Sequence, residues 1–184
     1  LGFSVLLIDY RGYGRSQGNF PHESQVYEDA ETAYNYLVKQ RQFSPGQILL
    51  YGHSLGGAVA IELAIKHPEA AGLIVQSSFT SMADMIGIND WMRIFPVRLL
   101  LTQKFDSIAK IPSLRMPVLF VHGTADPLIP ATMSKTLYAA SGEPKQLLLV
   151  PNAKHNNGDA FFNDREYRQT VVDFVSKIMH INKL

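Results

Sequence analysis

The chain has 184 residues, of which 46% are hydrophobic, and its formal net charge at pH 7 is +1. This length suits one domain with a sizeable core, and the near-neutral charge gives no indication of a nucleic-acid partner or an anionic membrane surface. The absence of cysteine excludes disulfides, Cys-based metal sites and a thiol nucleophile. No apolar run is long enough to span a bilayer.

The first residues of the chain already have the pattern of a core strand. Residues 3–8 form a short apolar run and are predicted to be the first strand. Because domains rarely begin abruptly inside a sheet, we interpret the chain as a fragment or a processed product. Any signal peptide or membrane anchor would then lie upstream of Leu1, and membrane association would have to come from that segment.

A turn-rich loop with three glycines, residues 9–18, follows this strand. Its glycines do not fit the G-x-G-x-x-G pattern of dinucleotide-binding loops, so the signal for phosphate binding is weak. We expect Asp9 and Arg11 to pair and fix the loop, in preference to a catalytic role.

Helices and strands alternate along the rest of the chain. Helices are predicted from periodic apolar stripes, and strands from short apolar runs bounded by turn residues. The predicted helices cover residues 21–40, 58–67, 131–141 and 159–179, and the predicted strands cover 47–51, 71–75, 116–121 and 146–150. This alternation predicts a single α/β domain over residues 1–184, with a mostly parallel sheet and helices on both faces.

Residues 81–110 break this alternation, because they are rich in apolar side chains but contain no clear strand. We interpret them as an inserted helical cap, or lid. In one interpretation, flexible and aromatic side chains of this segment line an acyl-binding pocket: Met82, Met85, Trp91 and Met92. In the other, the segment packs against the sheet as ordinary helices. The sequence leaves both open.

The stretch Gly52-His53-Ser54-Leu55-Gly56 fits the G-x-S-x-G pattern of a sharp turn between a strand and a helix. Such a turn strains the backbone at the serine, and glycines on either side allow close approach of neighbouring backbone. The free N–H groups at the start of the helix suit a developing oxyanion. The pattern therefore favours Ser54 as a nucleophile over a chance serine in a glycine-rich turn.

Ser54, Asp126 and His155 each follow the carboxyl end of a predicted strand. Because the carboxyl ends of parallel strands lie along one edge of the sheet, we expect these three residues to meet there. A serine hydroxyl needs an adjacent base, and the base needs a carboxylate that holds its tautomer. We therefore predict His155 as the general base and Asp126 as the residue that orients it.

The base and the acid are chosen partly by elimination. His53 lies beside the serine rather than facing it, and His122 precedes the acid loop and is expected to be structural. The other histidines lie at the ends of helices or of the chain: His22, His67 and His180. Asp84 is the main rival of Asp126 because it follows the preceding strand by a short loop, but it also fits the start of a helix. The other competing acids are Asp90 and Asp106.

Four motifs together resemble the α/β-hydrolase superfamily, with the catalytic residues in the order Ser, Asp, His. They are the loop 9–16, the turn 52–57, the segment 122–126 and the loop that carries His155. They are similar to one branch, the α/β-hydrolase domain proteins related to serine aminopeptidases and depalmitoylating acyl-protein thioesterases. The resemblance covers nearly the whole chain. It implies the α/β-hydrolase fold and a structural role for the glycine-rich loop near residue 12, but no particular substrate.

The resemblance also implies parts that this sequence lacks. The family's oxyanion hole uses the N–H after the nucleophile, here that of Leu55, and a second N–H from a loop after an upstream strand. No HG-type motif of that kind precedes Leu1, and a lost donor costs roughly 10²–10³ in rate. The family's strand order places the missing strand between residues 3–8 and the strand before Ser54. We therefore expect an N-terminally truncated hydrolase fold, and a natural protein that is longer or a chain that is an inactive remnant.

The sequence predicts a serine hydrolase that cleaves an ester or thioester, or an amide, through an acyl-enzyme on Ser54. Its substrate would be a small acyl ester, a thioester or an acylated protein, and neither a metal nor an organic cofactor is expected. The alternative is a catalytically inactive hydrolase-like fragment that binds a lipid or a protein partner. Halide or epoxide chemistry would need an Asp at the nucleophile position, and Ser54 argues against it.

Overall fold

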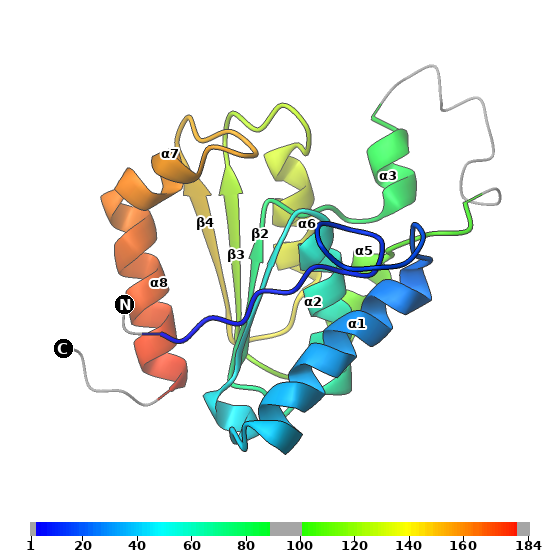
Figure 1. Cartoon of the computed structure of the whole chain (residues 1–184). Coiled ribbons are helices and arrows are strands. Elements are labelled where there is room, and N and C mark those ends of the chain that lie inside the picture. Colours follow the sequence, from blue (N-terminus) through cyan, green and yellow to red (C-terminus); the bar gives the residue numbers. More distant parts are fainter. Residues whose placement is uncertain (1–2, 89–100, 180–184) are drawn as a thin grey trace.

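A four-stranded parallel sheet with helices on both faces forms the centre of the molecule (Figure 1). The structure is a computed structural model, and it describes residues 3–88 and 101–179. The strands pair in chain order, and every pair is parallel. They are β1 Leu49–His53, β2 Gly72–Gln76, β3 Val118–Gly123 and β4 Lys145–Val150. The predicted α/β class and parallel sheet are confirmed.

One face of the sheet is covered by three helices, which Figure 1 shows on the right: α1 Glu23–Asn35, α2 Leu55–Lys66 and α6 Ala131–Ala140. Side chains alternate between the two faces along each strand. Leu73 and Val75 of β2 therefore point to this face, and Ile74 points to the other. Ile61 of α2 and Leu137 of α6 are fully buried in this first core.

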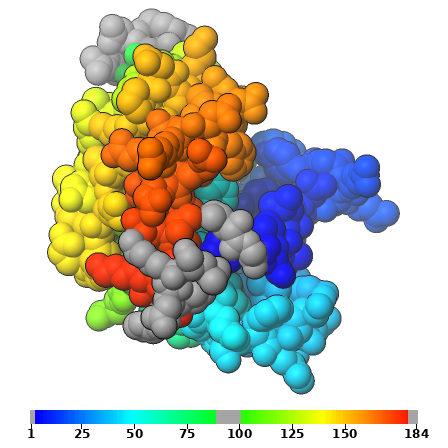
Figure 2. Space-filling view, turned by 90° about the vertical axis from the view of Figure 1, so that its left-hand side faces the viewer, coloured from blue at the N-terminus to red at the C-terminus, as the bar shows by residue number. Residues whose placement is uncertain are grey.

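The opposite face is covered by α7 Gly158–Asn163 and α8 Arg165–Ile178. Figure 2 looks onto this side, where the two helices lie in orange and red. Phe161 and Phe174 pack in a second core with side chains of β2, β3 and β4. The predicted single helix over 159–179 is thus two helices. The two helices are separated at Asp164. Its carboxylate accepts the Tyr167 N–H at 2.7 Å and so caps the start of α8, a position that favours aspartate.

The remaining elements are short. The predicted helix over 21–40 is α1 followed by a π-helical turn, and a short 3₁₀ turn leads into β1. In the described residues between β2 and β3 there are two helices and another 3₁₀ turn. In order these are η1 Tyr36–Gln40, η2 Pro45–Gln47, α3 Met82–Ile86, α5 Ser107–Lys110 and η4 Ile111–Ser113. Within the described ranges, no helix has both the length and the apolar character needed to cross a membrane.

The predicted strand over residues 3–8 is wrong. In Figure 1 this dark blue segment runs without an arrow, and it pairs with no strand of the described sheet. Its large side chains are exposed, reaching 86% for Leu7. An open groove lies beside it, lined by Leu6 and Ile8 together with residues of α1, β1 and α2. An apolar run becomes a strand only where a neighbour takes up its backbone N–H and C=O groups, and none of the strands that the structure describes does so here.

The expected ion pair between Asp9 and Arg11 is also wrong. The Arg11 guanidinium binds Asp29 of α1 instead, with its Nη2 at 2.6 Å and its Nε at 2.8 Å from Oδ1. The Asp9 carboxylate accepts the backbone N–H of Arg15 at 3.0 Å. Both guanidinium contacts go to Oδ1, and the other carboxylate oxygen of Asp29 accepts the backbone N–H of Arg11 at 2.8 Å. The loop is therefore fastened to α1.

The predicted helical cap over 81–110 is described only at its two ends. α3 lies at the start of this segment and α5 at its end. Met82 and Met85 of α3 are half-buried and pack against the first core. Trp91 and Met92 lie outside the described residues, so their place in an acyl-binding pocket stays a prediction.

Candidate active site

Ser54 stands at the sharp turn between β1 and α2. Its φ of 55° and ψ of −122° are a conformation that residues other than glycine rarely adopt. The Ser54 N–H donates to the Gln76 carbonyl at 3.0 Å, and the Ser78 hydroxyl donates to the Ser54 carbonyl at 2.9 Å. A Cβ at Gly52 would collide with the carbonyl of Gly56, so only glycine permits this approach of α2 to β1. The strained serine is held by β2 and by the segment that follows it.

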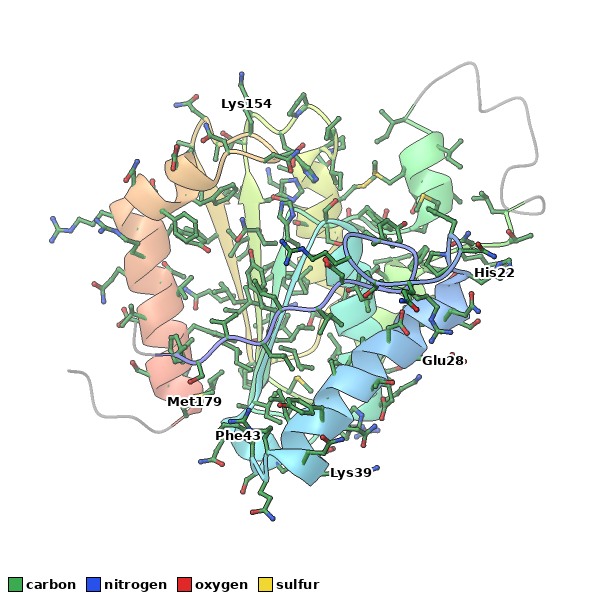
Figure 3. The ribbon with its side chains drawn as sticks, viewed as in Figure 1. His22, Glu28, Lys39, Phe43, Lys154 and Met179 are labelled. Carbon is green, nitrogen blue, oxygen red and sulfur yellow. The ribbon has the colours of Figure 1, made fainter. Side chains whose placement is uncertain are left out.

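The structure brings Ser54, His155 and Asp126 together. His155 Nε2 lies 3.0 Å from Ser54 Oγ, and His155 Nδ1 lies 2.7 Å from Asp126 Oδ2. A carboxylate only accepts hydrogen bonds, so Nδ1 carries a proton, and in the neutral ring Nε2 then accepts from the serine hydroxyl. All three residues follow the carboxyl ends of strands. Figure 3 labels Lys154, the residue before His155, above the arrowheads of β3 and β4.

The Asp126 carboxylate is fully buried and is held by the loop after β3. Its Oδ1 accepts the backbone N–H groups of Leu128 and Ile129, each at 2.9 Å. Burial acts to raise the pKa of this carboxyl. The Ile129 N–H, His155 and the Leu128 N–H outweigh burial, so the pKa lies below its ordinary value. Asp126 is therefore ionised at neutral pH and can hold an imidazolium.

A second histidine lies against the same carboxylate. His122 is fully buried at the end of β3, and its Nε2 is 3.3 Å from Asp126 Oδ2. Nε2 donates to the Ile129 carbonyl at 2.8 Å, and Nδ1 accepts from the Ser134 hydroxyl at 2.7 Å. Burial lowers the pKa of His122, which keeps the ring neutral. His122 thus ties the loop that carries Asp126 to α6.

The loops after β3 and β4 are joined to each other. The Ala125 N–H donates to the Ala153 carbonyl at 3.1 Å, and the Asn152 N–H donates to the Thr124 hydroxyl at 2.9 Å. A Cβ at Gly123 would collide with that Ala153 carbonyl, so the close approach of the two loops depends on glycine. These contacts fix the distance between the acid and the histidine.

Two of the rival acids and two of the other histidines occupy the ends of described elements. Asp84 lies in the first turn of α3 and accepts from the Thr80 hydroxyl at 2.7 Å. Asp106 caps α5. His22 precedes α1, and His67 contacts Glu31 and Glu69 beyond α2. Asp90 and His180 lie outside the described residues.

His53 is the site residue that the sequence reasoning set aside. Its ring lies 4.9 Å from the ring of His155, and its Nε2 lies 3.0 Å from the His155 carbonyl oxygen. Burial lowers the pKa of His53. The two residues are 102 positions apart, and no local pattern links them, so this contact could be found only in the folded chain.

Leu55 is the first residue of α2. Its N–H is one of the first N–H groups of the helix, which have no partner within the helix, and it follows the serine directly. This agrees with the position expected of an oxyanion donor. Among residues 3–88 and 101–179, no group of three or more His, Asp or Glu side chains is arranged to hold a metal ion.

Two family models match the chain. Residues 1–109, which include the serine turn, match the family described as serine aminopeptidase, S33. Residues 84–184, which include the acid and histidine loops, match the family described as PhoPQ-activated pathogenicity-related protein.

Longer relatives match most of the chain. The protein Rv2307c of Mycobacterium tuberculosis is 43% identical, and the match covers 85% of this chain and 54% of that protein. Protein bem46 of Schizosaccharomyces pombe is 34% identical, and the match covers 96% of this chain and 59% of that protein. The chain therefore spans little more than half the length of these relatives.

A solved structure with the same fold is that of the Paleococcus ferrophilus monoacylglycerol lipase. It is 21% identical, its match covers 94% of this chain and 81% of that one, and the TM-score is 0.62. A likeness at this identity supports the shared fold and not a shared substrate.

Proposed function

We propose that this chain, which belongs to the serine aminopeptidase S33 family, is a serine hydrolase that cleaves carboxylic esters or thioesters through an acyl-enzyme on Ser54. Family and fold make it a hydrolase of the α/β type. The observation that carries the finer proposal is the position of His155. Its ring bridges Ser54 at 3.0 Å and the buried Asp126 at 2.7 Å, which is the arrangement that activates a serine hydroxyl.

The first half of the reaction forms the acyl-enzyme. Ser54 Oγ attacks the substrate carbonyl while His155 Nε2 takes the hydroxyl proton. The ring becomes an imidazolium, and the ionised Asp126 stabilises it through Nδ1. His155 then gives the proton to the departing alkoxide or thiolate, which leaves as an alcohol or thiol. The acyl group remains on Ser54.

The second half repeats these steps with water. His155 accepts a proton from water, the resulting hydroxide attacks the acyl carbonyl, and the proton returns to Ser54 Oγ as the carboxylic acid leaves. The N–H of Leu55, at the start of α2, is the proposed donor to the oxyanion in both halves. The partial positive charge of the helix N-terminus acts in the same direction.

The preference for an ester or thioester rests on the apolar character of α3. Met82 and Met85 are half-buried on this helix, which follows the strand next to β1. Methionine side chains suit an acyl group, because they are apolar and adapt their shape. The family description names an aminopeptidase, so amides are the competing substrate class.

Labelling by a fluorophosphonate probe tests the proposal. We expect the wild type to be labelled and Ser54→Ala not to be, since only an activated serine attacks the phosphorus. Ser113→Ala, which removes an exposed hydroxyl on η4, is the matched control and should label like the wild type. Labelling that persists in Ser54→Ala, or a folded wild type that is not labelled, would contradict the proposal.

A substrate panel then separates the bond classes. p-Nitrophenyl acetate and butyrate, a butyryl thioester and an aminoacyl p-nitroanilide are compared by kcat/KM. We expect the esters and the thioester to exceed the anilide. A clear preference for the anilide would assign the chain to peptide chemistry instead.

A further inference from the structure

We infer that His53 is a positioning residue, which keeps the ring of His155 directed at Ser54 by binding its backbone carbonyl. The inference rests on the proposed serine hydrolase function. It assigns a role to the variable position of the G-x-S-x-G turn. His53 Nε2 lies 3.0 Å from the His155 carbonyl oxygen, and the two rings lie 4.9 Å apart at an interplanar angle of 43°.

The contact connects parts of the site that the sheet itself keeps apart. His53 ends β1, whereas His155 lies in the loop after β4, and β2 and β3 run between these strands. The anchors of the His155 loop described above all come from β3 and its loop. His53 adds an anchor from β1, the strand that leads directly into Ser54. The side chain of His53, the residue directly before Ser54, thus binds the main chain of His155.

The direction of the hydrogen bond defines the state of His53. A carbonyl oxygen only accepts, so Nε2 of His53 carries the proton and donates it. The half-buried ring resists a positive charge, which agrees with a neutral donor. A neutral ring at this distance adds no like charge when His155 becomes an imidazolium during the reaction. His53 itself contacts no reacting atom, and it acts through His155.

A purely structural role for His53 would have a different signature. If the ring only fills space, its replacement lowers the stability of the fold and leaves the turnover of the folded fraction unchanged. If it positions His155, turnover falls in a protein that remains folded, because a small displacement of the base costs rate. A misplacement of about 1 Å can cost up to roughly 100-fold.

Three variants of the full chain separate these roles. His53→Phe keeps an aromatic ring and removes the donor, whereas His53→Gln restores an N–H donor without the ring. Tyr51→Phe is the matched control, because Tyr51 lies on the same face of β1 and loses only its 3.1 Å hydrogen bond to Gln76. For each variant, kcat and KM for p-nitrophenyl acetate are measured beside the urea midpoint.

We expect His53→Phe to lower kcat by roughly 10-fold with little change in KM or in the urea midpoint. His53→Gln should recover part of that loss, and Tyr51→Phe should turn over like the wild type. A wild-type kcat in His53→Phe would overturn the inference. So would a loss in His53→Phe that is matched by a lower midpoint and not recovered by His53→Gln.

An NMR signal makes the inference testable apart from activity. The proton between His155 Nδ1 and Asp126 is expected to give a far-downfield resonance, which reports the position of the ring. We expect His53→Phe to shift or broaden it, and Tyr51→Phe to leave it unchanged. If the wild type neither labels nor turns over ester, the proposed function fails. An unchanged resonance in His53→Phe then overturns the positioning role separately.

Discussion

Asp126 is the residue of the site whose charge is held most firmly by the fold. Its carboxylate is fully buried and accepts from two backbone N–H groups and from His155. These contacts favour the ionised form and bring the pKa of Asp126 below its ordinary value. Because the unfolded chain lacks them, the stability that they contribute depends on pH.

We expect this contribution to be fully present above the pKa of an unfolded aspartate, about 3.9, and to disappear as the pH falls through the lower folded pKa. The substitution Asp126→Asn removes the ionisable carboxyl and with it this pH-dependent contribution to stability. The difference in free energy of unfolding between wild type and variant should therefore be constant near neutral pH and should shrink in strong acid. Urea unfolding over a pH series measures it, and a difference that grows on acidification would contradict the prediction.

The junction of β1 and α2 is the element that sets the conformation of Ser54. The strand ends at His53, the helix begins at Leu55, and Ser54 between them has a positive φ. This arrangement requires the backbone of α2 to approach that of β1 at Gly52. The packing of a strand and a helix is therefore linked directly to the strain at one residue.

Gly52→Ala should destabilise the fold by about 1–3 kcal/mol, the usual cost of forcing extra atoms into a packed position. Because the added Cβ meets rigid backbone, it should also displace Ser54 and reduce fluorophosphonate labelling. Gly46→Ala is the control, since a Cβ there meets nothing within 4 Å and should change stability by less than about 0.5 kcal/mol. Urea unfolding compares the two variants, and equal effects would refute the packing argument.

Over the whole molecule, the sheet separates two cores, and each is closed by its own helices. α1, α2 and α6 close one core, and α7 and α8 close the other. Phe161 and Phe162 are neighbours on α7 with opposite environments, since the first is 1% exposed and the second 67% exposed. Truncation of each phenylalanine in turn therefore measures how much burial in the second core adds to the free energy of unfolding.

Phe161→Ala should cost about 3–5 kcal/mol of unfolding free energy, as buried phenylalanines do when they are truncated. Phe162→Ala removes the same atoms from a solvent-exposed position and should cost about 0.5 kcal/mol or less. The measurement is urea unfolding of both variants. A comparable loss in the two would mean that α7 contributes little to the second core.

The parts of the fold that the sequence predicted correctly are those with local signals. The alternation of helices and strands, and the turn at Ser54, depend on residues close together in the chain. Asp126 and His155 were placed by one topological rule, that carboxyl ends of parallel strands share an edge. The features that the sequence did not predict depend on contacts between residues that are far apart in the chain. Residues 3–8 lacked a strand neighbour, Arg11 found Asp29 on α1, and the His53 contact spans 102 positions.

The order of the elements has a consequence for synthesis of the protein. In the part of the chain that the structure describes, the helices that cover the second face of the sheet both follow the last strand. A ribosome releases the chain from its N-terminus, so all four strands emerge before α8 can close that face. A nascent chain that stalls before Arg165 therefore lacks the side chains that α8 adds to the second core, among them Phe174 and Val175.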